Sequence, residues 1–203
     1  EIFKSLSQLR LPVISARTEW QAIRRVRALH LDTLTGVALG ERGLNPARRR
    51  SVLITEELTD KISLEDYTAS YRLPAPFRRA LIALTADIAR TLHANGVNHR
   101  DFYICHFLMD RSVAEAPDQD RLRLWLIDLH RAQVRQRTPT RWKVKDLAAL
   151  YFSAMEAGLT RRDRLQFIRC YSGLPLRTAL AEQGRFWGAV EARAQRLRGH
   201  RRE

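Results

Sequence analysis

Two aspartates of this chain lie in contexts that suit phosphoryl transfer. Asp101 ends the tripeptide His99-Arg100-Asp101, which follows an expected helix and matches the catalytic-loop pattern of kinases. In that pattern the aspartate accepts the proton of the hydroxyl that attacks the phosphate. Asp128 follows the apolar run 124–127, and a carboxylate at the end of such a strand can hold Mg²⁺ against nucleotide phosphates. The pair predicts a phosphotransfer site, and two structural aspartates in turns are the alternative.

Histidines replace two residues of the kinase pattern. His106 stands where the pattern has asparagine, and Asp128-Leu129-His130 stands in place of Asp-Phe-Gly. Because Mg²⁺ prefers oxygen ligands, His106 is a metal ligand in one interpretation and orients Asp101 or contacts phosphate in the other. We expect His99 and His130 to pack or to form hydrogen bonds rather than to act as acid–base catalysts.

The first part of the chain is expected to be a small mixed α/β unit. Thr18-Glu19-Trp20-Gln21 has the form of a capping box, which predicts a helix over about residues 19–29. Strands are expected over 33–40 and 51–57, with a turn over Gly43-Leu44-Asn45-Pro46. A change of character near residues 60–70 predicts two lobes, 1–60 and 61–203, with a cleft between them.

A long helix is expected to deliver the catalytic loop. Leu81, Ile88 and Leu92 fall on one helical face, and Asn95-Gly96 ends that helix just before His99. Short strands are expected over 107–109 and 121–127 around a polar loop 110–120, followed by helices over 144–155, 161–171 and 176–198. Asp146, expected at the opening of a helix, complements the helix dipole or tethers the catalytic loop. The fold class is therefore α+β with a mostly helical second lobe.

The charge of the chain predicts an anionic partner without identifying it. Lys and Arg number 36 against 22 Asp and Glu, a net charge of +14. Nucleic acid, anionic lipid, lipopolysaccharide, nucleotide and an acidic protein all satisfy this charge. The segment 131–145 holds six basic residues and no acid, and we expect it to lie on the acceptor side of the cleft. Its cations are Arg131, Arg135, Arg137, Arg141, Lys143 and Lys145.

Composition excludes several other classes of protein. Hydrophobic residues make up 45% of the chain, which is incompatible with a disordered chain. Two distant cysteines provide neither a disulfide framework nor a zinc site. No apolar run reaches the roughly 18 residues of a membrane-spanning helix.

These motifs together resemble the lipopolysaccharide core heptose I kinase family (WaaP, also called RfaP) of Gram-negative bacteria, which has a protein-kinase-like, two-lobed fold. The resemblance extends over essentially the whole chain. It is carried by Glu1-Ile2-Phe3-Lys4, Leu9-Arg10-Leu11-Pro12-Val13, Ile54-Thr55-Glu56-Glu57-Leu58, Ile62-Ser63-Leu64-Glu65-Asp66-Tyr67, Asn98-His99-Arg100-Asp101, Tyr103-Ile104-Cys105-His106-Phe107-Leu108 and Ile127-Asp128-Leu129-His130-Arg131-Ala132-Gln133.

The resemblance implies ATP-dependent phosphorylation of a heptose in the lipopolysaccharide inner core, by a cytoplasmic protein peripheral to the inner membrane. It implies Asp101 as the catalytic base, Asp128 as the Mg²⁺ ligand and Glu19 as the partner of a phosphate-binding lysine. The segment 56–58, which is Glu56, Glu57 and Leu58, would be the nucleotide hinge. The basic charge would then serve an anionic glycolipid and an anionic membrane surface, with no nucleic acid partner, and an acidic protein partner remains open on charge grounds.

The resemblance also implies parts that this sequence does not contain. A glycine-rich strand pair and a nucleotide-binding lysine should precede Glu19, and the surroundings of Lys4 match a later family segment. The first lobe is therefore expected to be incomplete in this chain. Two alternatives to a heptose kinase stay open: another small-molecule or protein kinase of similar fold, and a non-catalytic basic binding module.

Overall fold

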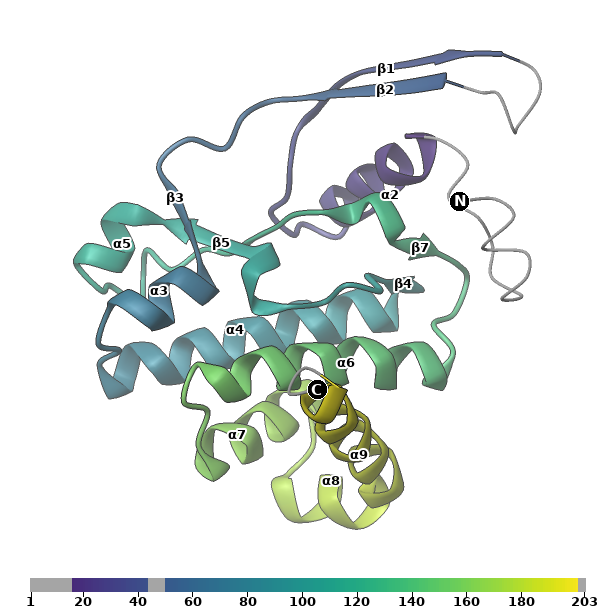
Figure 1. Ribbon diagram of the computed structural model, residues 1–203. Coiled ribbons are helices and arrows are strands. Elements are labelled where there is room, and N and C mark those ends of the chain that lie inside the picture. The colour runs from purple at the N-terminus through teal and green to yellow at the C-terminus, as the bar shows by residue number, and fades with distance from the viewer. Residues whose placement is uncertain (1–15, 44–49, 201–203) are drawn as a thin grey trace.

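The computed structural model describes residues 16–43 and 50–200. A helix and a two-stranded hairpin lie over a larger helical part (Figure 1). The helix is α2 (Arg17–Ala28), and the antiparallel hairpin pairs β1 (Gly36–Arg42) with β2 (Arg50–Thr55). Ala22, Ile23 and Val26 are the buried residues of α2, and this single apolar stripe holds the helix on the molecule.

Short strands lie between the hairpin and the long helices. A three-stranded antiparallel sheet has the order β3 (Lys61–Ser63), β5 (Phe107–Asp110) and β6 (Trp125–Leu126). A second pair joins β4 (Val97–Asn98) to β7 (Gln133–Val134). Two 3₁₀ turns, η1 (Ile104–His106) and η2 (Leu129–Arg131), interrupt these strands. The strands therefore bring the segments around residues 98–106 and 125–134 together.

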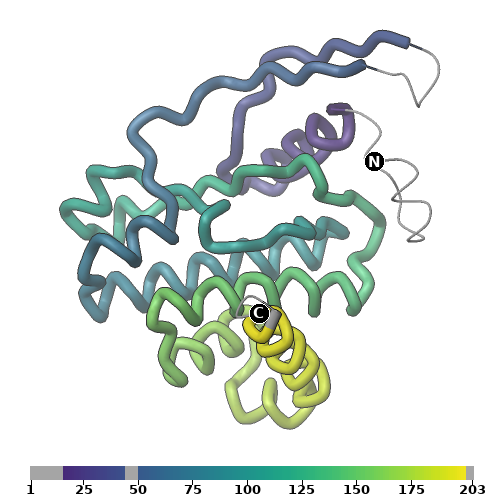
Figure 2. The backbone as a smooth tube through the Cα atoms, in the orientation of Figure 1, coloured from purple at the N-terminus to yellow at the C-terminus, as the bar shows by residue number. Residues whose placement is uncertain are grey.

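Helices form the remainder of the molecule. Behind the strands run α4 (Ala75–Ala94) and α6 (Thr140–Glu156), with α7 (Arg161–Ser172), α8 (Leu176–Glu182) and α9 (Gly184–His200) packed beneath them (Figures 1 and 2). The short helices α3 (Leu64–Ser70) and α5 (Arg111–Glu115) flank β3 and β5. One continuous core of buried side chains links α4, the strands and α6. The loop that contains Asp101 is thus packed against the helical part of the molecule.

Several expectations about elements are confirmed and several are wrong. The helix before the catalytic loop, the hairpin and the α+β class are confirmed. The capping box is wrong, because α2 begins at Arg17 and its N-cap, Ala16, makes no side-chain cap. The polar loop 110–120 contains α5, and the strand expected over 121–127 is only two residues long. The helix expected over 176–198 is two helices that meet at Gln183.

The structure does not test two further expectations. Leu44, Asn45 and Pro46 of the expected turn lie outside the described residues, as do the family segments at the start of the chain. The division of the chain at residue 60 stays a prediction.

Gly96 joins α4 to β4 in a conformation that only glycine adopts easily, and this generates a prediction. Its φ is +79°, and an added Cβ would lie 1.8 Å from the carbonyl oxygen of Arg135. Gly96→Ala should therefore lower the free energy of unfolding by at least about 2 kcal/mol, measured by chemical denaturation. Gly188→Ala is the matched control, because a Cβ there meets nothing within 4 Å. It should raise stability by about 0.5–1 kcal/mol. An equal effect of both changes would contradict this account.

Candidate active site

A buried carboxylate holds the catalytic loop in place. Asp146 is 0% exposed, and its two oxygens accept hydrogen bonds from the backbone N–H of His99 at 2.7 Å and of Arg100 at 2.9 Å. Arg100 has φ 78°, a left-handed conformation that costs a non-glycine residue free energy. The two charge-assisted bonds offset that cost. Asp146 therefore fixes the backbone immediately before Asp101.

The tether was one of the two roles expected for Asp146, and the other is wrong. Helix α6 begins at Thr140, so Asp146 lies well inside the helix and not at its N-terminus. His93 on α4 also faces this carboxylate, with Nε2 at 3.4 Å, while its Nδ1 lies 2.9 Å from the hydroxyl of Tyr171. A chain of buried polar groups thus joins α7, α4 and α6 to the loop.

The carboxylate of Asp101 lies at the surface of this loop. Nη1 of Arg131 donates to both of its oxygens, at 2.8 and 2.9 Å. Arg131 comes from η2, thirty residues further along the chain. The side chain of Asp101 keeps 17% of its surface exposed, so another molecule can reach it. Arg131 therefore orients the carboxylate without enclosing it.

His106 links Asp101 to Asp128. Its Nδ1–H donates to the backbone carbonyl of Asp101 at 2.7 Å, and its Nε2 lies 3.3 Å from a carboxylate oxygen of Asp128. Neutral His106 in this tautomer therefore turns a lone pair towards Asp128. His130 pairs with the same carboxylate through Nδ1, and Asp128 has the left-handed φ of 60°. A lone pair and a carboxylate that face each other at this distance fit a cation between them.

Those two side chains do not form a complete metal site alone. No group of three His, Cys, Asp or Glu within residues 16–43 and 50–200 is arranged to hold a metal ion. Mg²⁺ is usually bound by one or two protein carboxylates together with phosphate oxygens and water. Asp128 and His106 thus fit a site that a nucleotide would complete.

The other predicted site residues have different surroundings. Glu19 on α2 is half-buried; burial raises its pKa, the electrostatic interaction with His130 lowers it, and the interaction with Asp128 raises it. The backbone N–H of Glu56 donates to the carbonyl of Thr35 at 2.9 Å. Glu57 is exposed, and no hydrogen bond among the described residues joins the segment 56–58 to Asp101 or Asp128. The structure joins Asp101, His106 and Asp128, and Glu19 interacts electrostatically with Asp128. The hinge role of 56–58 stays a prediction.

His99 has the structural role that its sequence context predicts. It is 1% exposed, and its Nε2–H donates to the carbonyl of Ile127 at 2.9 Å. Burial is the main cause that lowers its pKa, which favours the neutral ring. The ring stacks on His106 with 5.7 Å between centroids. His99 thus packs the base loop against the strand that carries Asp128.

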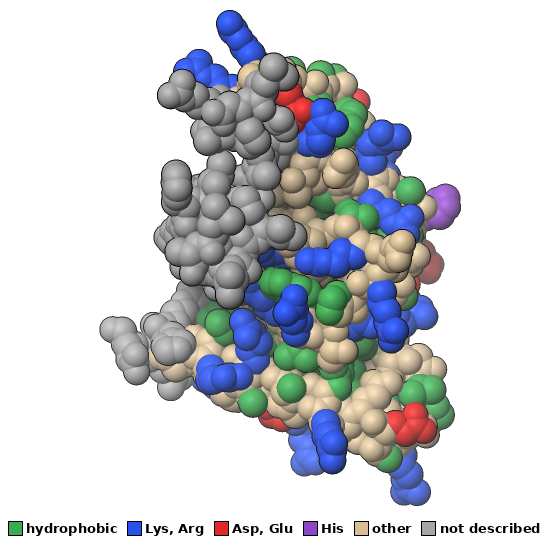
Figure 3. Space-filling view, turned by 90° about the vertical axis from the view of Figure 1, so that its right-hand side faces the viewer, with side chains coloured by type: hydrophobic (Ala, Val, Ile, Leu, Met, Phe, Trp, Pro, Cys, Tyr) green, Lys and Arg blue, Asp and Glu red, His purple; other side chains and the backbone are tan. Residues whose placement is uncertain are grey.

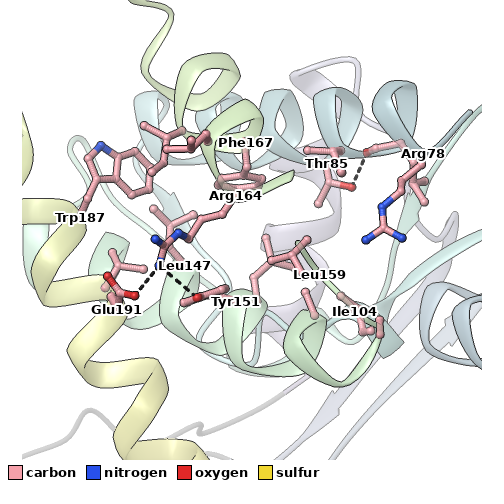
Figure 4. Close-up of a pocket in the computed structure, with 18 of the residues that line it drawn as sticks. Arg78, Thr85, Ile104, Leu147, Tyr151, Leu159, Arg164, Phe167, Trp187 and Glu191 are labelled. Carbon is pink, nitrogen blue, oxygen red and sulfur yellow. Dashed lines mark hydrogen bonds and ion pairs between the residues drawn. The ribbon is translucent and has the colours of Figure 1, made fainter. Parts of the chain in front are cut away.

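A cavity of about 350 Å³ opens away from this site (Figure 4). Apolar side chains of α4, α6, α7 and α9 form most of its wall, including Leu81, Leu147 and Trp187. Arg164 spans one side, where it donates to the hydroxyl of Tyr151 at 3.2 Å and pairs with Glu191. Ile104 of the catalytic loop also lines the cavity. The sequence carried no sign of it, because helical periodicity does not distinguish a filled core from a hollow one.

Comparisons with known proteins point to a single family. Residues 1–171 match the model of the lipopolysaccharide kinase (Kdo/WaaP) family. The chain is 45% identical over 201 residues to the lipopolysaccharide core heptose(I) kinase WaaP of Escherichia coli K12, covering 98% of this chain and 75% of that protein. It is 48% identical over 202 residues to the protein of that name from Pseudomonas aeruginosa PAO1, covering 97% and 74%.

A solved structure is also similar. It is described as WaaP in complex with acyl carrier protein, with a TM-score of 0.81 and 48% identity, covering 90% of this chain and 76% of that chain. The likeness confirms the kinase-like fold expected from the motifs.

The tether generates a prediction about Asp146. Asp146→Asn keeps the shape, but an amide nitrogen cannot accept the bond from one of the two backbone N–H groups. We expect a loss of about 2–4 kcal/mol in the free energy of unfolding and faster hydrogen exchange at the amides of His99 and Arg100. Asp87→Asn is the control, since Asp87 pairs with Arg90 on the exposed face of α4 and should change stability little. Unchanged exchange at both amides would refute the tether.

Proposed function

The chain belongs to the lipopolysaccharide kinase (Kdo/WaaP) family and is a kinase of the lipopolysaccharide core, and from that premise we propose that Asp101 is its general base and Asp128 its Mg²⁺ ligand. The acceptor is a heptose hydroxyl and the donor is ATP. The single observation that carries the assignment is the bridge from the Asp101 carbonyl through His106 to the Asp128 carboxylate.

Asp101 acts by accepting a proton. Arg131 occupies one lone pair on each oxygen of Asp101, which leaves a second lone pair for the acceptor hydroxyl. As the hydroxyl oxygen attacks the γ-phosphorus, its proton passes to Asp101 and the bond to the leaving ADP oxygen breaks. Arg131 contacts both carboxylate oxygens, which limits rotation of the carboxylate during this step.

Asp128 and His106 would hold the metal ion from the protein side. When it is bound, Mg²⁺ would neutralise negative charge on the phosphates. His130 pairs with the Asp128 carboxylate and Glu19 interacts with it electrostatically, so both would surround the proposed ligand. Glu19 would pair with the phosphate-binding lysine.

We place the enzyme at an anionic membrane surface on the cytoplasmic side. No described helix combines the length and apolarity needed to cross a bilayer, so contact would be peripheral. The net charge of +14 supports this, since each Lys or Arg near such a surface contributes about 1 kcal/mol. The same charge suits the glycolipid acceptor, and nucleic acid is not required to explain it.

Replacing the base is the direct test. Asp101→Asn should lower kcat for phosphate transfer from MgATP to lipopolysaccharide core by about 10²- to 10⁴-fold, because the amide cannot take up the proton. The measurement is steady-state transfer by the full-length protein, with thermal unfolding as the check on folding. Asp118→Asn, at an exposed loop acid, should retain full turnover. Full turnover in Asp101→Asn would exclude this residue as the base, and failure of the unaltered protein to transfer phosphate would favour a binding module.

We also propose an acyl carrier protein as a partner. The related structure contains one, and the basic surface of this chain suits an acidic protein. An acyl group on such a carrier needs an apolar site to leave water, and the cavity beneath the catalytic loop offers it. Because Ile104 lines that cavity, an occupant would also support the loop that follows Asp101.

Filling the cavity tests this partner. Ala154 lines it, so Ala154→Phe should remove the thermal stabilisation that an acylated carrier protein gives, while the effect of MgATP persists. Ala192→Phe is the matched control, since Ala192 is exposed on α9 and lies outside the cavity. If Ala154→Phe responds to the acylated carrier as the unaltered protein does, the acyl chain does not enter there.

A further inference from the structure

Four cations surround one indole next to the base. Arg100, Arg135 and Arg141 lie with their guanidinium carbons 5.5, 5.7 and 5.6 Å from the ring centroid of Trp142. The ammonium of Lys145 lies 5.3 Å from it. We call these five residues the Trp142 cluster. They come from the catalytic loop, the segment after β7 and the first two turns of α6, so folding alone brings them together.

The Trp142 cluster carries more positive than negative charge. The acids that face Lys145 are Asp101 and Asp146. Asp101 is already bound by Arg131, and Asp146 by the backbone of the catalytic loop. Burial lowers the pKa of Lys145, and Arg100 and Arg131 lower it further. Cation–π contacts offset part of the repulsion among Arg135, Arg141 and Lys145, and an anion bound between them would relieve the remainder.

We propose that the Trp142 cluster binds an oxyanion, a carboxylate or a phosphate, carried by the acceptor sugar chain beside the heptose that is phosphorylated. This inference rests on the proposed function and adds a determinant of acceptor specificity to it. Arg100 of the cluster directly precedes Asp101 in the chain, so an anion bound here would hold the acceptor hydroxyl near the base. The indole offers an apolar face for a sugar ring between the charges.

An anion from the segment that follows Asp128 does not explain the cluster. Protein kinases order their activation loops when a phosphorylated residue of the loop pairs with arginine. Here residues 129–139, which follow Asp128, contain no acid and a single hydroxyl, that of Thr138. Thr138 is 2% exposed and donates to the carbonyl of Val97 at 3.3 Å, so it is inaccessible to modification. The segment that follows Asp128 therefore does not supply the anion, and an acceptor that carries one is the source we propose.

The members of the cluster have different roles. Arg135 donates to the side chains of Asn98 and Gln133, so it holds β4 and β7 together and is a poor choice for a binding test. Arg141 is exposed, and Lys145 is partly so. The face that carries β7 and the start of α6 shows many Lys and Arg side chains and few acidic ones (Figure 3). Arg141 and Lys145 are therefore the cations that an incoming acceptor meets.

The test compares acceptors that differ only in charge. Full-length protein is assayed with MgATP and three soluble oligosaccharides in which the sugar next to the heptose carries a carboxylate, a phosphate or a neutral alcohol. We expect kcat/KM about tenfold higher for a charged acceptor than for the neutral one. The better of the two charged acceptors identifies the oxyanion. Arg141→Gln and Lys145→Met should each reduce this preference several-fold through KM for the acceptor, while KM for ATP stays unchanged.

The control and the opposing outcomes separate this inference from the proposed function. Arg162→Gln removes the same charge from an exposed site on α7 and should keep the full preference. Because Arg141 is exposed, Arg141→Gln remains informative even if Lys145→Met unfolds. Equal kcat/KM for charged and neutral acceptors in the unaltered protein, or an unchanged preference in Arg141→Gln, would overturn the inference while kinase activity stands. Failure to phosphorylate any of the three acceptors would instead count against the heptose kinase itself.

Discussion

The site depends on one buried carboxylate. Asp146 accepts the N–H groups of two consecutive residues, and it does so from a helix 46 and 47 residues away in the chain. A loop that passes through a left-handed residue would otherwise relax, and a carboxylate without partners would be costly inside the protein. The two backbone N–H groups and the carboxylate therefore satisfy each other's hydrogen-bonding capacity. The position of Asp101, the base that we propose, depends on these two bonds, because Asp101 follows the tethered backbone directly.

A histidine makes the two acidic residues parts of one unit. One ring nitrogen of His106 bonds to the backbone carbonyl of Asp101, and the other lies next to the carboxylate of Asp128. An asparagine in that place would present an amide, whereas the imidazole presents a lone pair whose direction is set by its other hydrogen bond. The imidazole therefore links the backbone of Asp101 to the side chain of Asp128. His106 as a metal ligand remains our proposal.

The cations of the basic segment 131–145 make several different kinds of contact. Arg131 pairs with Asp101, Arg135 ties β4 to β7, and Arg141 and Lys145 lie against Trp142 at the start of α6. Part of the charge of the segment therefore holds the site together. That the segment serves an acceptor stays a prediction.

The sequence by itself determined the local elements and the family. Short-range patterns predict helix α4, the turn at Gly96 and the motifs around Asp101 and Asp128, because periodicity and turn chemistry involve residues a few positions apart. Only the tertiary structure decided which side chains meet. Arg131 reaches Asp101 across 30 residues, and the cavity arises between helices whose apolar faces look complete when each is taken alone. Long-range contacts and packing depend on the whole fold, and short patterns carry no record of them.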